Sequence, residues 1–148
     1  MEFRRLRDTD DLEAVADFAI AGMRADLYPG LRVSREKVLA VVEHCQRSAA
    51  DFHLVAFDAG RIVAAIAAIK HEMLWFERCE AHVIICRSVA PGAGFRLFAA
   101  LRRWADEDMM VRRVVFPIEF HADPRQAEVL ARRYGFKQRA DALVHSKE

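Results

Sequence analysis

A strand-like run, a turn with two glycines and a helical pattern follow one another within residues 82–105, and this stretch constrains the fold more than any other. The apolar run 82–86 leads into a turn that contains Gly92 and Gly94, and the helical pattern begins directly after it. The first N–H groups of such a helix have no partner inside the helix, and the helix dipole adds partial positive charge there. Because glycines lack Cβ atoms, an anionic group can approach this backbone closely. The stretch predicts a phosphate-binding turn between a strand and a helix, with an ordinary turn as the alternative.

Length, charge and cysteine content narrow the class of protein. The chain of 148 residues suffices for one domain with its own core, and we expect a single domain over residues 1–148. The net charge of +1 gives no argument for nucleic acid or an anionic membrane as a partner. Three cysteines without metal-binding spacing, together with the lack of a signal-peptide pattern or a bilayer-spanning run, predict a reduced, cytoplasmic protein that holds no metal.

Hydrophobic periodicity and turn signals divide the chain into an ordered series of strands and helices. Strands are predicted at residues 2–6, 52–57, 61–69, 79–86, 114–116, 136–139 and 142–145. Helices are predicted after Asp8 or Thr9, after Ser34, after the glycine turn and after Asp123, the last with Pro124 at its first position and Gly135 at its end. This order predicts an α/β (α+β) domain in which a mixed, strongly twisted central sheet is flanked by helices.

Three segments resemble motifs of the GNAT family of acyl-CoA-dependent N-acetyltransferases. Residues 89–98 are similar to the family's (Gln/Arg)-x-x-Gly-x-(Gly/Ala)-x-x-Leu-hydrophobic motif, with Val89 in the polar first position. Residues 124–136 resemble Asn-x-x-Ala-x-x-Leu-Tyr-x-x-x-Gly-Phe, although Pro124 replaces the Asn and Ala131 replaces the Tyr. The turn that starts at residue 58 resembles a family hairpin. The resemblance spans nearly the whole chain and implies the GNAT fold, and the glycine turn also resembles that of phage-type members.

The resemblance implies that acetyl-CoA binds between the fourth and fifth strands. Its pantetheine arm would lie along Ile84, Ile85 and Cys86, and its pyrophosphate would lie on the backbone of the glycine turn. The residues implied to hold the pyrophosphate are Val89, Pro91, Gly92, Ala93, Gly94, Phe95 and Arg96. Pro91 can contribute shape but no N–H, and Arg96 either contacts a phosphate or is solvated.

The implied reaction is attack of a neutral amine on a thioester carbonyl, which needs a base, an oxyanion donor and a proton for the leaving thiolate. Glu80 and His82 alternate on one face of the predicted fourth strand and are the candidate catalytic residues, with solvated strand-end side chains as the alternative. Glu119 and His121 have the same spacing after the fifth strand. The family's usual proton donor, a Tyr, corresponds to Ala131, which cannot donate a proton.

The sequence allows more than one role for two tyrosines and for one apolar segment. Tyr134 is expected in the core, and Tyr28 lies on a loop that could reach the cleft. Residues 73–76 could line an acceptor pocket or a dimer surface, although packing against the sheet is the expectation.

The sequence therefore predicts an acetyl-CoA-dependent N-acetyltransferase that acts on a small-molecule or peptide amine. Because dimers are common in the family that it resembles, the resemblance also suggests a homodimer. The alternative is a non-catalytic GNAT-like module that binds CoA or regulates a partner. Val89, Pro124 and Ala131 favour the module, whereas Gly92 and Gly94 favour the enzyme. A toxin-like enzyme acting on charged tRNA would need a basic surface, which the net charge of +1 does not indicate.

Overall fold

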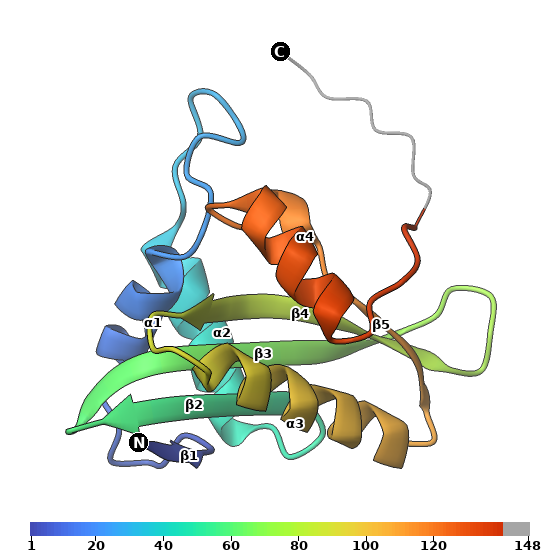
Figure 1. Cartoon of the computed structure of the whole chain (residues 1–148), viewed down its shortest axis with the longest axis horizontal. Coiled ribbons are helices and arrows are strands. Elements are labelled where there is room, and N and C mark those ends of the chain that lie inside the picture. Colours follow the sequence, from blue (N-terminus) through green and yellow to red (C-terminus); the bar gives the residue numbers. More distant parts are fainter. Residues whose placement is uncertain (141–148) are drawn as a thin grey trace.

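Five strands form one sheet through the middle of the molecule (Figure 1). The computed structural model describes residues 1–140. In order across the sheet, the strands are β1 (Glu2–Arg4), β2 (Phe52–Asp58), β3 (Arg61–Glu72), β4 (Cys79–Ser88) and β5 (Val111–Val115). The strands β1 to β4 are antiparallel to one another, whereas β5 runs parallel to β4. The predicted mixed sheet is confirmed.

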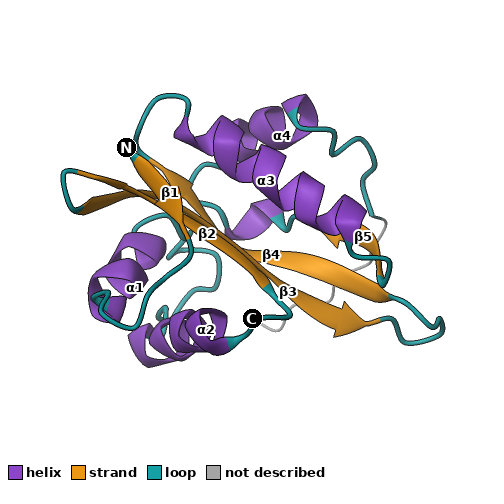
Figure 2. Cartoon of the chain, turned by 90° about the horizontal axis from the view of Figure 1, so that it is seen from below, coloured by secondary structure: helices purple, strands orange, loops and turns teal. Residues whose placement is uncertain are grey.

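Helices cover both faces of this sheet (Figure 2). On one face lie α1 (Leu12–Ile20) and α2 (Arg35–Arg47), and on the other lie α3 (Ala93–Glu107) and α4 (Pro124–Arg133). A short 3-10 helix, η1 (Ile118–Phe120), connects β5 to α4. No helix within residues 1–140 is long and apolar enough to cross a membrane.

The core has one half on each face of the sheet. On one face, Val15 of α1 and Val42 of α2 are buried against the sheet. On the other face, Phe98 and Leu101 of α3 are buried against it. Residues 64–68 of β3 are buried throughout, and all but one are alanine. Small side chains on both faces let the two helical layers approach this central strand closely. β3 therefore contacts helices on both faces of the sheet.

Local capping signals set most helix starts. Ser34 and Asp123 cap α2 and α4 as predicted, each accepting an N–H of the first turn, at 3.3 and 3.0 Å. The cap of α1 was predicted two or three residues too early, because Asp11 rather than Asp8 or Thr9 accepts the first-turn N–H, at 3.1 Å. A turn in which the Asp10 N–H donates to Arg7 O separates the earlier residues from the helix.

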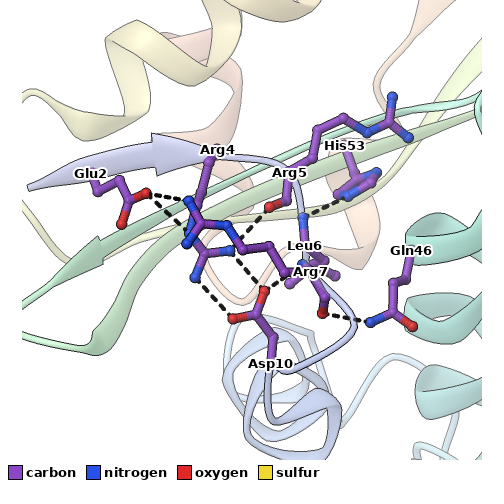
Figure 3. Close-up of polar contacts among 8 residues, drawn as sticks. All are labelled: Glu2, Arg4, Arg5, Leu6, Arg7, Asp10, Gln46 and His53. Carbon is purple, nitrogen blue, oxygen red and sulfur yellow. Dashed lines mark hydrogen bonds and ion pairs between the residues drawn. The ribbon is translucent and has the colours of Figure 1, made fainter.

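A polar network ties β1 to the start of α1 and to β2 (Figure 3). Arg4 makes two hydrogen bonds to the Asp10 carboxylate, at 2.7 and 2.8 Å, and the Arg7 N–H donates to the same carboxylate at 2.6 Å. The bond from Arg4 is the main cause that lowers the pKa of Asp10. The Leu6 N–H donates to Nε2 of His53 at 2.9 Å, and burial lowers the pKa of His53 to about 4. His53 is therefore a neutral acceptor inside the fold.

The C-terminal part of the sheet differs from the prediction. β5 covers Val111–Val115 rather than 114–116, and it is a half-buried edge strand of the described sheet rather than a buried strand. Residues 136–139 form no strand; Phe136 packs into an aromatic cluster with Phe98 and Phe116, at ring distances of 5.8 and 6.0 Å. The strand predicted at 142–145 lies outside the described residues.

The apolar segment 73–76 does not pack against the sheet. It forms the tip of the β3–β4 connection, where Leu74, Trp75 and Phe76 are 82%, 83% and 68% exposed. The expectation of simple packing was therefore wrong. The tip lies at the far end of the long strands β3 and β4, beyond the helices that cover the sheet (Figure 1).

Candidate functional site

The strands β4 and β5 pair at one end only and then separate. Their register ends where His82 lies opposite Val115, and within residues 1–140 no later residue of β4 pairs with β5. The register of β4 with β3 shifts just beyond this point, so that Ile84 is an extra, bulged residue. The chain after β5 turns away through Pro117 into η1. The result is a fork whose inner edge is the backbone of residues 83–88.

A cavity of about 530 Å³ lies at this fork. Its walls come from β4, the end of β3, the segment after β5 and the loop between α1 and α2. That loop is joined to the segment after β5 by two backbone hydrogen bonds, from Arg24 N–H to Phe120 O at 2.8 Å and from Ala122 N–H to Gly22 O at 3.0 Å. The cavity has the volume of a small-molecule site and fixed walls on opposite sides.

The glycine turn lies at the end of β4 and begins α3. Gly92 has φ +75°, and a Cβ there would meet no atom within 4 Å, so the backbone is open on this side. The Ala90 carbonyl accepts hydrogen bonds from Ser88 Oγ at 3.1 Å and from Ala93 N–H at 3.2 Å. These two bonds hold the shape of the turn and occupy one of its N–H groups.

The next N–H groups of α3 are available to a ligand. Within the described chain, the N–H groups of Gly94 and Phe95 have no hydrogen-bond partner, and no side chain caps the helix. The Val89 and Phe95 side chains are more than half exposed, at 58% and 61%. The Arg96 guanidinium lies over the ring of Phe3, 4.9 Å from its centroid, so this side chain points toward β1. The turn offers main-chain donors and a helix dipole, with no charged side chain of its own above them.

The predicted pantetheine-side residues all line the cavity. Ile84, Ile85 and Cys86 belong to its β4 wall. Ile85 is 6% exposed and also belongs to the core beneath α1 and α2. Burial raises the pKa of the Cys86 thiol to about 12, so this thiol stays neutral and acts as a small apolar group.

The two candidate bases occupy different positions. Nε2 of His82 lies 2.9 Å from Oε2 of Glu80, and Nε of Arg113 donates to the other carboxylate oxygen at 2.7 Å. The hydrogen bonds from His82 and then Arg113 lower the pKa of Glu80, so Glu80 is ionised and only accepts. Nε2 of His82 must then carry a proton, and in the neutral imidazole Nδ1 keeps a lone pair. His82 lines the cavity, whereas Glu80 lies behind it and does not.

Further histidines and a tyrosine share the cavity wall. The ring of His71, on β3, meets that of His82 edge to face at 4.9 Å, and both residues line the cavity. His121 also lines it, and its Nδ1 accepts the Asp123 N–H at 3.2 Å. Tyr28 reaches the cavity from the α1–α2 loop, as the sequence suggested. His71 was missed, because only the pairing of β3 with β4 brings it beside His82.

No hydroxyl group is present at the position of Ala131, where the GNAT motif has its proton-donating Tyr. Ala131 is 4% exposed on α4 and packs in the core. Tyr134 stacks on Phe98 with ring centroids 4.9 Å apart and meets Phe95 edge to face, which agrees with its expected core position. Neither residue lines the cavity.

Solved structures with the same arrangement of strands and helices identify the fold. An acetyltransferase of the GNAT family from Streptococcus pneumoniae is 18% identical, with a TM-score of 0.64 over 94% of this chain and 86% of that one. The chain has the GNAT fold. Glucosamine-6-phosphate N-acetyltransferase from Arabidopsis thaliana, another GNAT-like structure, is 13% identical, with a TM-score of 0.65 over 99% of this chain and 98% of that one.

A third similar structure contains a ligand. The aminoglycoside N-acetyltransferase AAC(6')-Iy, in complex with the bisubstrate analogue CoA-S-monomethyl-acetylneamine, is 17% identical, with a TM-score of 0.68 over 99% of this chain and 97% of that one. No sequence-family model and no curated protein sequence matches this chain. At these identities the similarity establishes the GNAT fold, and the chemistry must be argued from the fork itself.

Proposed function

We propose that this protein is an acetyl-CoA-dependent N-acetyltransferase that transfers an acetyl group to the primary amine of a small molecule or peptide. One observation carries the proposal: the stretch of β4 that β5 leaves unpaired leads directly into a helix start whose N–H groups are free. A GNAT-fold structure that contains a CoA conjugate supports it.

The residues of the fork fit CoA. The main-chain edge of residues 83–88 can pair with the amide groups of a pantetheine arm, as a strand would. The N–H groups of Gly94 and Phe95 can donate to a pyrophosphate, and the open side of Gly92 leaves room for it. Bound acetyl-CoA would supply the thioester carbonyl that the acceptor amine attacks.

His82 is the proposed general base. Its free Nδ1 can take a proton from the acceptor's ammonium group, and the ionised Glu80 at Nε2 holds the ring in the required tautomer. Glu80 is thus a positioning residue, itself held by Arg113. Main-chain N–H groups around the bulge at Ile84 can stabilise negative charge on the carbonyl oxygen. Tyr28, on the cavity wall, is the proposed proton donor to the leaving thiolate.

Calorimetric titration with acetyl-CoA and CoA, combined with a thiol-release assay over a panel of amines, tests the proposal. His82→Ala should lower kcat by roughly 100-fold and leave the Kd for acetyl-CoA unchanged. Glu80→Gln should lower kcat less, and Glu80→Asp should restore part of it. Glu128→Gln is the matched control, because Glu128 also forms ion pairs with arginines, but its partners Arg132 and Arg139 lie outside the cavity.

Three outcomes would reject parts of the proposal. Absence of binding to either form of the coenzyme would reject the coenzyme site. Binding without thiol release from any amine would favour the non-catalytic module, for which Ala131 is the structural argument. Normal turnover in both the His82 and the Glu80 variants would reject these two assignments and leave the coenzyme site intact.

A further inference from the structure

The charged side chains that line the cavity, among the described residues, are all basic. Among the described residues that line the cavity, two are arginines (Arg24 and Arg32), three are histidines and none is an aspartate or a glutamate. An acceptor that carries several ammonium groups would find no counter-charge on these walls. Like charges placed together across a binding site disfavour a ligand and so contribute to specificity.

The two arginines differ in how far they are neutralised. Nε of Arg24 lies 3.1 Å from the Asp26 carboxylate, whose side chain is 83% exposed and does not line the cavity. Within residues 1–140, Arg32 has no carboxylate within ion-pairing distance of 4.0 Å. Both residues lie on the α1–α2 loop, which its backbone hydrogen bonds hold against the segment after β5. A guanidinium at a cavity without a protein partner is suited to a carboxylate or phosphate of the ligand.

Several apolar side chains that line the cavity are also exposed to solvent. Leu31, Tyr28 and Phe120 line the cavity yet are 68%, 47% and 45% exposed. Exposed apolar side chains gathered at a cavity are typical of a surface that a ligand covers. An acceptor with an apolar body would bury them.

We propose that the acceptor is a small primary amine with an aromatic or aliphatic body and one anionic group, and that Arg32 binds this anionic group. The proposal rests on the acetyl transfer proposed above. It excludes polycationic acceptors such as aminoglycosides, although a protein of similar fold acts on that class.

A matched set of amines tests this acceptor class. Benzylamine, 4-(aminomethyl)benzoate and its phosphonate counterpart share one body and differ in charge, and spermidine and neamine represent the polycations. The kcat/KM of at least one anionic member should exceed that of benzylamine by about tenfold, and the polycations should be the poorest acceptors. Comparing the carboxylate with the phosphonate shows which anionic group the site prefers.

Arg32→Ala should remove the advantage of the anionic amines by raising their KM, so that they are used no better than benzylamine. Arg103→Ala is the matched control, because Arg103 is also an exposed arginine but lies on α3, outside the cavity. If turnover is too slow to measure, the same order should appear in the Kd values of the amines for the CoA-saturated protein.

Equal use of benzylamine and its anionic analogues, or a preference for spermidine or neamine, would overturn the acceptor class and leave acetyl transfer intact. An advantage that survives in Arg32→Ala would overturn the role of Arg32. A protein that binds no coenzyme would overturn the proposed function, and this inference with it.

Discussion

The substitution Gly92→Ala separates the strain in the glycine turn from its role in coenzyme binding. Gly92 has φ +75°, where an L-residue is disfavoured by about 1–2 kcal/mol, and a Cβ there would clash with nothing. The stiffer unfolded chain of the alanine variant offsets about 0.4–1 kcal/mol of this cost. The free energy of unfolding should therefore fall by about 1 kcal/mol, which lowers Tm by about 3 °C in a chain of this size.

Gly60→Ala is the matched control for this variant. Gly60 has φ +76° and equally open surroundings, but it lies in the turn between β2 and β3 rather than at the start of α3. Both variants should show the same loss of stability in urea denaturation. Only Gly92→Ala should weaken the binding of CoA, by about tenfold in a calorimetric titration, because the methyl group occupies the open side of the turn and relaxation of φ would reorient its donors.

Two results would refute this reasoning. If Gly92→Ala binds CoA as well as Gly60→Ala does, the phosphates lie elsewhere. If Gly60→Ala loses no stability, positive φ is not the source of the cost at either position.

Two other changes test the site and the core. A Cβ at Gly94 would be in ordinary van der Waals contact, 3.7 Å from Ser88 Cβ and 3.9 Å from Leu130 Cδ2, so Gly94→Ala should fold and bind CoA. Gly94→Glu should abolish CoA binding, because it adds bulk and negative charge to the turn. Equal affinity of the two variants for CoA in calorimetry would contradict the assignment of the phosphate-binding turn. Burial lowers the pKa of His53 to about 4. Between about pH 6.5 and pH 4, His53 is therefore protonated in the unfolded chain but neutral in the folded protein. The free energy of unfolding should accordingly fall by about 3 kcal/mol between pH 6.5 and pH 4, and His53→Gln should lack this part of the decline in urea denaturation across that range; an unchanged slope in the variant would contradict the buried, neutral state of His53.

The features that the sequence predicted are those that neighbouring residues determine. Ser34 and Asp123 cap their helices through N–H groups three residues away. Gly92 adopts positive φ because a strand turns into a helix within a few residues. A periodic apolar pattern identified the face of α3 that packs on the sheet. Each of these depends on interactions within about one helical turn, so the sequence contains them directly.

The features that were missed depend on register between distant strands. His71 comes beside His82 because the β3–β4 register places His71 opposite Glu80 and Ile69 opposite His82, which no local pattern indicates. Arg113 holds Glu80 because a parallel register brings together residues from strands separated by a whole helix. Glu80 and His82 looked equivalent in the alternating strand pattern. Only the register with β5 shows that one is ion-paired behind the cavity while the other lines it.

The departures of the glycine turn from the GNAT motif have a structural explanation. The Val89 side chain is 58% exposed, and the Val89 N–H donates to Val63 O at 2.9 Å, so the side chain in the motif's polar position does not shape the turn. The turn is instead shaped by the Ser88 hydroxyl and the Ala93 N–H, both of which donate to the Ala90 carbonyl. A site built from main-chain donors accepts many side chains, provided that the backbone path is kept. Loss of a polar side chain at Val89 is therefore weak evidence against coenzyme binding. Loss of the tyrosine hydroxyl at the position of Ala131 is the stronger argument against catalysis, since it removes the family's usual proton donor and leaves Tyr28 as the proposed one.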